Sequence, residues 1–124
     1  MDVATLANIV TGLVAALHVC FLVLEMFLWD KPAGLRVFRQ TREAAAATKV
    51  LAANQGLYNG FLAAGLVWGI ALGDAGTAIK VFFLGCVVIA GVFGALTASR
   101  RILYIQALPA AVALALLWAV YCFP

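Results

Sequence analysis

Two ionisable side chains in an apolar stretch near the start of the chain are the first candidates for chemistry. His18 and Glu25 lie seven residues apart in "ALHVCFLVLEMFLW". At 100° per residue, Thr11 and Trp29 fall within about 20° of the same line on a helix. An imidazole and a carboxyl group in such a helix can hold or pass a proton, or pair with a cation, and they normally face a bundle interior. This stripe is therefore predicted to point inward.

A second polar group interrupts the segment "AANQGLYNGFLAAGL". On a helix, one arc of about 140° holds four hydrogen-bonding residues, namely Asn54, Gln55, Tyr58 and Asn59. The opposite arc holds Gly56, Gly60 and Ala64, in the small-xxx-small spacing that lets two helix backbones approach closely. We expect that small arc to meet another helix, in the same chain or in a neighbouring subunit.

Depth links these groups to a third segment. At 1.5 Å per residue, Glu25, Asn54 and Gln106 each lie about 6 Å inside the predicted cytoplasmic boundary of the membrane. His18 lies about 16 Å inside the same boundary. Asn54 and Tyr58 are predicted to face Glu25 and Gln106 around a polar pocket that opens toward the cytoplasm. The predicted ligand-binding residues are His18, Glu25, Asn54, Gln55, Tyr58, Asn59 and Gln106.

The elements that hold these residues follow from composition. The chain has 124 residues, of which 67% are hydrophobic and only 10% are charged. A soluble domain has about a quarter of its residues charged, and a spanning helix needs about 20 mostly apolar residues. We predict an all-α integral membrane bundle of four transmembrane helices in a single domain, 1–124. The helices are expected at about 4–29, 50–73, 78–98 and 102–123.

The basic residues predict the orientation of this bundle. The first link carries five of them, namely Lys31, Arg36, Arg39, Arg42 and Lys49. The third link carries Arg100 and Arg101, whereas the second has only Lys80. Basic loops face the cytoplasm, so both termini are predicted outside, in a multi-pass protein of the bacterial inner (plasma) membrane. The predicted partners are the lipid bilayer, a small amphipathic ligand and further copies of the chain. Nucleic acid is not expected, because no soluble basic surface exists.

Known catalytic and metal-binding motifs are absent, and three functions stay open. The chain has no Walker loop and no GxGxxG, HExxH or CxxC pattern. No metal and no cofactor are predicted, since one histidine and three dispersed cysteines do not make an ordinary zinc site. In the first, the chain is predicted to bind or move a small amphipathic or cationic molecule, with Glu25 taking a proton or pairing with the cation. Alternatively, it is an accessory subunit whose polar groups only hold helices together.

The third open function is a membrane enzyme with Glu25 or His18 as the acid or base for a lipid-soluble substrate. These two residues lie about 10 Å apart along one helix, which suits a proton path or a long pocket better than one reaction centre. Ligand binding is therefore slightly preferred over the accessory role, and both are preferred over catalysis.

Nearly the whole chain resembles the domain of unknown function 1304 family of small bacterial membrane proteins. The resemblance is carried by "ALHVCFLVLEMFLW", "NQGLYNGFLAAGLVWG" and "AGVFGALTASRRILYIQALPA". The positions that match the family pattern are His18, Glu25, Trp29, Asn54, Gln55, Gly56, Tyr58, Asn59, Gly60, Gln106 and Pro109. The resemblance implies a four-helix bacterial inner-membrane protein and no established activity.

Overall fold

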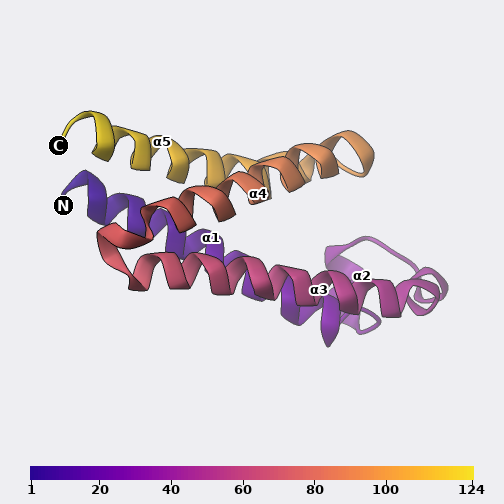
Figure 1. Ribbon diagram of the computed structural model, residues 1–124. Coiled ribbons are helices and arrows are strands. Elements are labelled where there is room, and N and C mark those ends of the chain that lie inside the picture. Colours follow the sequence, from indigo (N-terminus) through magenta and orange to yellow (C-terminus); the bar gives the residue numbers. More distant parts are fainter. The chain divides into compact units, whose positions relative to one another are not determined.

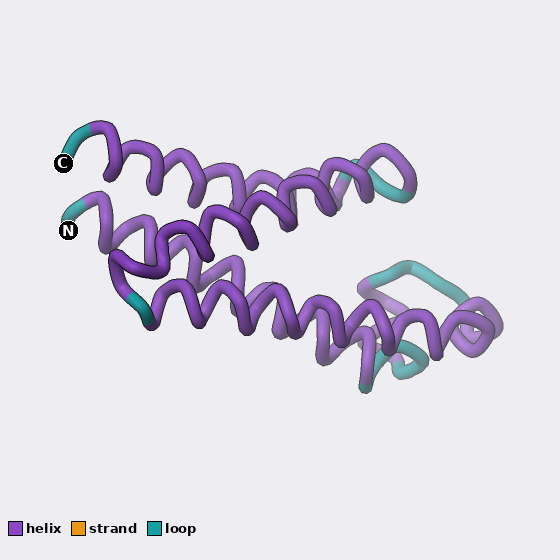
Figure 2. The backbone as a smooth tube through the Cα atoms, viewed as in Figure 1, coloured by secondary structure: helices purple, strands orange, loops and turns teal.

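The chain consists of helices and short loops, with no strand (Figures 1 and 2). The computed structural model describes all residues, 1–124. Its α-helices are α1 (Val3–Met26), α2 (Pro32–Val37), α3 (Arg42–Ala71), α4 (Thr77–Thr97) and α5 (Leu108–Cys122). A 3-10 turn, Gly73–Gly76, precedes α4, and a π-helical turn, Leu103–Ala107, precedes α5. The prediction of an all-α chain is confirmed.

Three helical segments are long and apolar enough to cross a membrane. They are Val3–Met26, Gly73–Thr97 and Leu103–Cys122. Such segments are typical of an integral membrane protein. The predicted span at 50–73 is not among the three, although α3 has 30 residues. Its apolar run is interrupted by the amides of Asn54, Gln55 and Asn59, which lower its apolar character.

The start of α3 differs from the expected start near residue 50. The Thr41 hydroxyl oxygen accepts a hydrogen bond from the Ala44 backbone N–H at 3.1 Å, which is the geometry of an N-cap. Glu43 lies in the first turn, where the helix dipole favours an acid, and alanines follow at 44–47. The basic link is therefore partly helical, because its local sequence favours a helix although its charge excludes it from a membrane.

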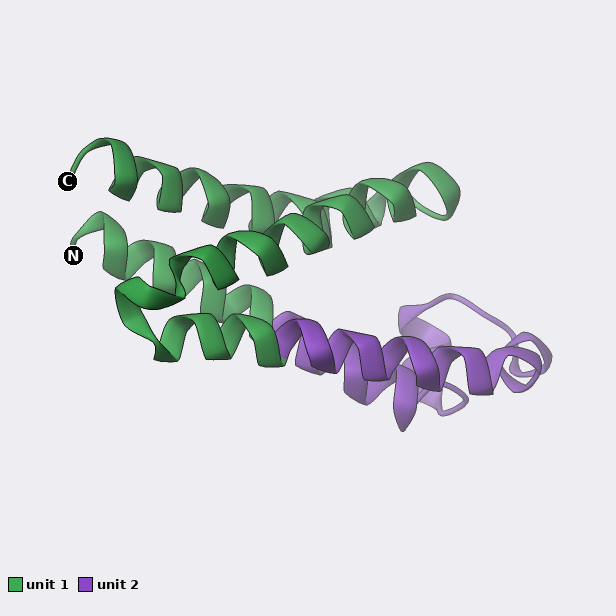
Figure 3. Cartoon of the chain, viewed as in Figure 1, with its two compact units in different colours: residues 1–15, 64–124 green, residues 16–63 purple.

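The chain divides into two compact units, which are coloured separately in Figure 3. Unit 1 comprises residues 1–15 and 64–124, and unit 2 comprises residues 16–63. The predicted single domain stays a prediction. In unit 2, Lys49 Nζ donates to Asp30 Oδ2 at 2.9 Å, and Trp29 Nε1 donates to Thr48 Oγ1 at 3.1 Å. These two bonds hold the residues that follow α1 against the first turns of α3.

In unit 1, α4 packs closely on the π-helical turn. A Cβ atom added to Gly91 would lie 2.6 Å from the backbone nitrogen of Ala107, so only glycine fits there. Leu84 and Val87 continue the same buried face of α4. The Leu108 N–H bonds the carbonyl of Leu103, five residues back, directly before Pro109, which has no amide to donate. A widened turn beside a proline keeps backbone groups bonded where a regular α-helical turn would lose one.

Candidate functional site

The Glu25 carboxyl group and the Asn59 amide form the buried polar contact of unit 2. Asn59 Nδ2 donates a hydrogen bond to Glu25 Oε2 at 3.2 Å. The relative exposure of Glu25 is 5% and that of Asn59 is 7%. A carboxyl oxygen accepts a hydrogen bond whether or not the group is ionised. Glu25 can therefore gain or lose a proton without losing this contact.

No Lys or Arg side chain neutralises Glu25. The ion pair of this unit joins Lys49 to Asp30, and the hydrogen bond to Glu25 comes from a neutral amide. A carboxylate that is buried without a cation is costly, and the cost is relieved by protonation or by a positive partner. The arrangement thus suits a group that carries a proton or accepts a cation from outside the chain.

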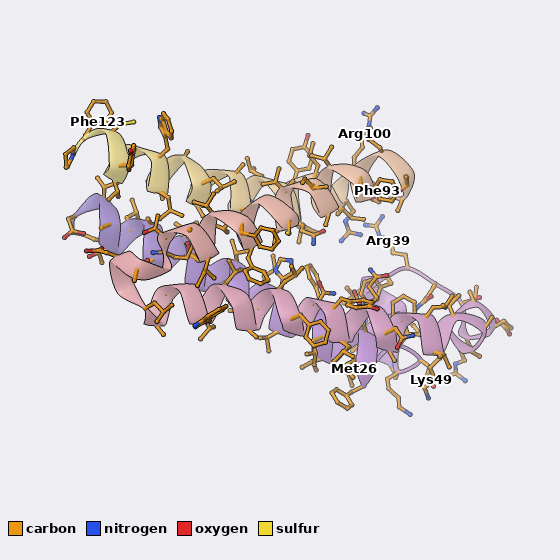
Figure 4. All side chains as sticks on the ribbon, in the orientation of Figure 1. Met26, Arg39, Lys49, Phe93, Arg100 and Phe123 are labelled. Carbon is orange, nitrogen blue, oxygen red and sulfur yellow. The ribbon has the colours of Figure 1, made fainter.

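Glycines in α3 let this contact form. A Cβ atom on Gly56 would lie 2.6 Å from Met26 Cγ, 3.1 Å from Glu25 Cβ and 3.2 Å from the Leu22 carbonyl oxygen. A Cβ atom on Gly60 would lie 2.7 Å from Leu22 Cδ1. The prediction that the small arc meets a helix is confirmed for these two glycines, and the helix is α1. Met26, at the end of α1, is labelled in Figure 4.

The stripe along α1 points inward, as predicted. Thr11 and His18 are fully buried, and Glu25 nearly so. Thr11 Oγ1 donates to the Ala7 carbonyl at 2.7 Å, so its hydroxyl is satisfied within its own helix. The His18 ring meets the Phe21 ring edge to face, with centroids 5.7 Å apart. His18 also takes part in a contact of its own, and Glu25 bonds the Asn59 side chain of α3.

The polar arc of α3 does not face Glu25 as a whole, which corrects the prediction for Asn54 and Tyr58. Both side chains are exposed, as is that of Gln55, and Tyr58 has a relative exposure of 63%. The reason lies in helix geometry, since Asn59 is about 60° from Gly56, whereas Asn54 and Tyr58 are about 160° from it. The glycine face sets which side of α3 is buried, and only the edge of the polar arc is buried with it.

Gln106 lies in the π-helical turn of unit 1, whereas Glu25 and Asn59 lie in unit 2. Gln106 is half-buried and takes part in a contact of its own. Its predicted place in one polar layer with Glu25 stays a prediction, as does the ligand-binding role of all seven residues.

A buried pair in unit 1 was not predicted from the sequence. The sequence counts Lys80 among the basic residues of the second link, although the predicted helix at 78–98 includes it. The structure places it in the first turn of α4, with 4% relative exposure. Lys80 Nζ donates to Asn8 Oδ1 at 2.8 Å, and its stem packs where a Cβ atom on Gly69 would lie 2.6 Å from Lys80 Cγ. An Asn near the start of α1 and a lone Lys near the start of α4 were the available signal.

The structure gathers no set of three His, Cys, Asp or Glu residues that would hold a metal ion.

Comparison with known proteins identifies the family. The family model described as "Protein of unknown function (DUF1304)" matches residues 12–118. A relative named "Uncharacterized protein YpaA", from Lactococcus lactis subsp. lactis (strain IL1403), is 30% identical over 105 residues, which cover 82% of this chain and 88% of the relative. No solved structure matches the chain. Since the family match includes both residues of the Glu25–Asn59 pair and most of the chain, this protein belongs to the DUF1304 family.

Proposed function

We propose that this protein binds or moves a small amphipathic or cationic molecule in the bacterial inner membrane, with Glu25 taking its proton or pairing with its positive group. The observation that carries the proposal is the buried Glu25 carboxyl, which bonds the neutral Asn59 amide and no basic side chain. Ionisable residues inside spanning helices generally mark substrate or proton pathways. An amphipathic cation would supply the missing charge and would also tolerate an apolar site.

The proposal includes α3 as a fourth span. The bond from Lys80 to Asn8 joins the beginnings of α4 and α1, so both helices start at the same end of unit 1. The 24 residues of α1 extend about 36 Å, which is long enough to carry the chain to the other membrane surface. The 30 residues of α3 extend about 45 Å, enough for the return crossing that α4 requires.

The basic residues support the orientation of the four spans. Those that precede or begin α3 or α5 would lie at one surface, namely Lys31, Arg36, Arg39, Arg42, Lys49, Arg100 and Arg101. Arg39 and Lys49 of unit 2 are labelled in Figure 4. The positive-inside rule makes that surface cytoplasmic and puts both termini outside. Glu25, in the last turns of α1, would then be reached from the cytoplasmic side.

Binding of tetraphenylphosphonium, a lipophilic cation, tests the proposal by calorimetry on the detergent-purified protein. We expect the wild type to bind it and Glu25→Gln to bind at least about tenfold more weakly, because the amide keeps the size of the side chain but not its charge. Glu43→Gln is the matched control, since Glu43 is exposed in the first turn of α3. A folded Glu25→Gln protein with wild-type affinity would remove the proposed function.

An accessory role is the second candidate, and the same hydrogen bond favours it. The Asn59–Glu25 bond joins α1 to α3 beside the close approach at Gly56. Amides and carboxyl groups often hold spanning helices together in this way. A purely structural pair predicts that Glu25→Gln behaves as the wild type in every assay, while Glu25→Leu unfolds more easily.

A further inference from the structure

A second polar surface on α3 takes no part in the Glu25 contact. We define the outward polar face as Leu51, Asn54, Gln55 and Tyr58, whose spacing of i, i+3, i+4 and i+7 puts them on one side of a helix. All four side chains are exposed, Leu51 to 70%. The Tyr58 ring contacts the Phe61 ring edge to face at 5.9 Å, and neither Asn54 nor Gln55 makes a side-chain hydrogen bond within the chain.

This face conflicts with a position in lipid. The segment from Val50 to Ala71 has no charged residue, which fits the span proposed above. Lipid offers nothing to the two amides, and unpaired donors and acceptors are costly in hydrocarbon. The close-packed face of α3, with Gly56 and Asn59, is already occupied by α1. Within unit 2 the outward polar face has no partner, so it requires one outside that unit which supplies donors and acceptors and lies at the same depth.

We infer that the partner is a second copy of this chain, and that the outward polar face is the contact of a two-fold symmetric dimer. An amide side chain both donates and accepts, so each Asn54 and Gln55 can bond its counterpart without a charged or shape-specific ligand. Hydrogen bonds between such amides associate spanning helices. The inference rests on the proposed fourth span, but it does not require Glu25 to bind anything.

The symmetry fixes which residues meet. Copies inserted in one orientation are related by an axis along the membrane normal, so each residue of the face lies at the depth of its own counterpart. Leu51 would then approach Leu51 of the second copy, with the two amides one turn further along. Leu57 lies about 9 Å further along α3 than Leu51, within the length of this face, but about 110° away from it, so its counterparts would stay apart.

Oxidative cross-linking in native membranes tests the dimer. Cys20, Cys86 and Cys122 are free, and they are first replaced by serine or alanine. We expect Leu51→Cys to form a disulfide-linked dimer with copper phenanthroline, and the matched control Leu57→Cys to remain monomeric. Adding Asn54→Leu and Gln55→Leu to the Leu51→Cys protein should reduce the dimer at least about fivefold, because the amides are then absent.

The following results of cross-linking and labelling would each contradict a part of the proposal. Equal cross-linking of Leu51→Cys and Leu57→Cys, or none in either, overturns the dimer, and so does a dimer that persists without the two amides. A membrane-impermeant maleimide is applied to both Leu51→Cys and Leu57→Cys in broken membranes. Labelling of both overturns the fourth span itself. Cysteines that are protected but not cross-linked overturn the dimer alone, and leave the fourth span and the Glu25 proposal standing.

Discussion

At the scale of residues, Asn59 determines the setting of Glu25. Its neutral amide bonds one carboxyl oxygen and supplies no positive charge. A lysine or arginine at this position would hold Glu25 permanently ionised, whereas an asparagine permits both protonation states. The choice of an amide thus suits a carboxyl group that titrates or takes a cation.

Removing the Asn59 amide should destabilise the protein. Asn59→Leu leaves the buried Glu25 carboxyl without its hydrogen bond, at an expected loss of about 1–3 kcal/mol in the free energy of unfolding. Thermal unfolding in detergent measures the loss. The double variant Glu25→Leu/Asn59→Leu should lose less than the sum of its two single variants, since no polar group is then left unpaired. Additive losses would show that the two side chains do not depend on each other.

Elements determine where these residues point, and glycines set how closely the elements approach. Gly56 and Gly60 meet α1 in unit 2, and Gly91 meets the π-helical turn in unit 1. A methyl group at such a position must displace backbone or side-chain atoms of the neighbouring helix. Helix α4 also contains Gly85, which has open space around it, so a matched comparison is practical there.

The α4 contact gives such a comparison. Gly91→Ala should lower the free energy of unfolding by about 1–3 kcal/mol, because the new Cβ would lie 2.6 Å from the Ala107 backbone nitrogen. Gly85→Ala has nothing within 4 Å of its new Cβ and should be neutral or stabilising, by up to about 1 kcal/mol of helix propensity. Equal effects in thermal unfolding would contradict the close approach of α4 to the turn.

The loop between α1 and α3 predicts a pH dependence. The hydrogen bond from Lys49 lowers the pKa of the Asp30 carboxyl below its ordinary value. The stabilisation from the Asp30–Lys49 pair is therefore present at neutral pH, and it is lost as the pH falls below about 4 and Asp30 is protonated. The effect should be small because the pair is exposed. Asp30→Asn should show a shallower fall in unfolding temperature between pH 6 and pH 3, and identical slopes would contradict the pair.

The sequence predicted helix positions better than helix faces. The apolar runs locate α1, α4 and the π-helical turn with α5 within about three residues, because a spanning helix must be apolar along its length. The start of α3 at Arg42 was missed, since helix propensity and hydropathy differ in an alanine-rich charged segment. The inward stripe with Glu25 was predictable from spacing alone. Spacing alone could not predict that Asn59 is buried and Tyr58 is exposed, because this difference depends on how the glycine face packs.

At the scale of the whole molecule, the proposed topology places both termini outside. In a protein whose one cysteine is the native Cys122, an impermeant maleimide added to intact cells with a permeable outer envelope should label it. Ala46→Cys, in an otherwise cysteine-free chain, should be labelled only after the inner membrane is opened, because the proposed topology puts the basic link in the cytoplasm. Labelling of Ala46→Cys in sealed cells, together with protection of Cys122, would show that the orientation is the opposite of the proposed one.

The central claim is that Glu25 is a buried carboxyl that carries a proton or accepts a cation, and carbodiimide labelling tests it most directly. Dicyclohexylcarbodiimide modifies protonated carboxyl groups in apolar surroundings, and mass spectrometry of peptides identifies the modified residue. We predict modification at Glu25 and not at the exposed Glu43. We also predict that tetraphenylphosphonium slows the reaction at Glu25 in the folded protein. A Glu25 that stays unmodified, or that reacts equally fast with and without the cation, would contradict the account.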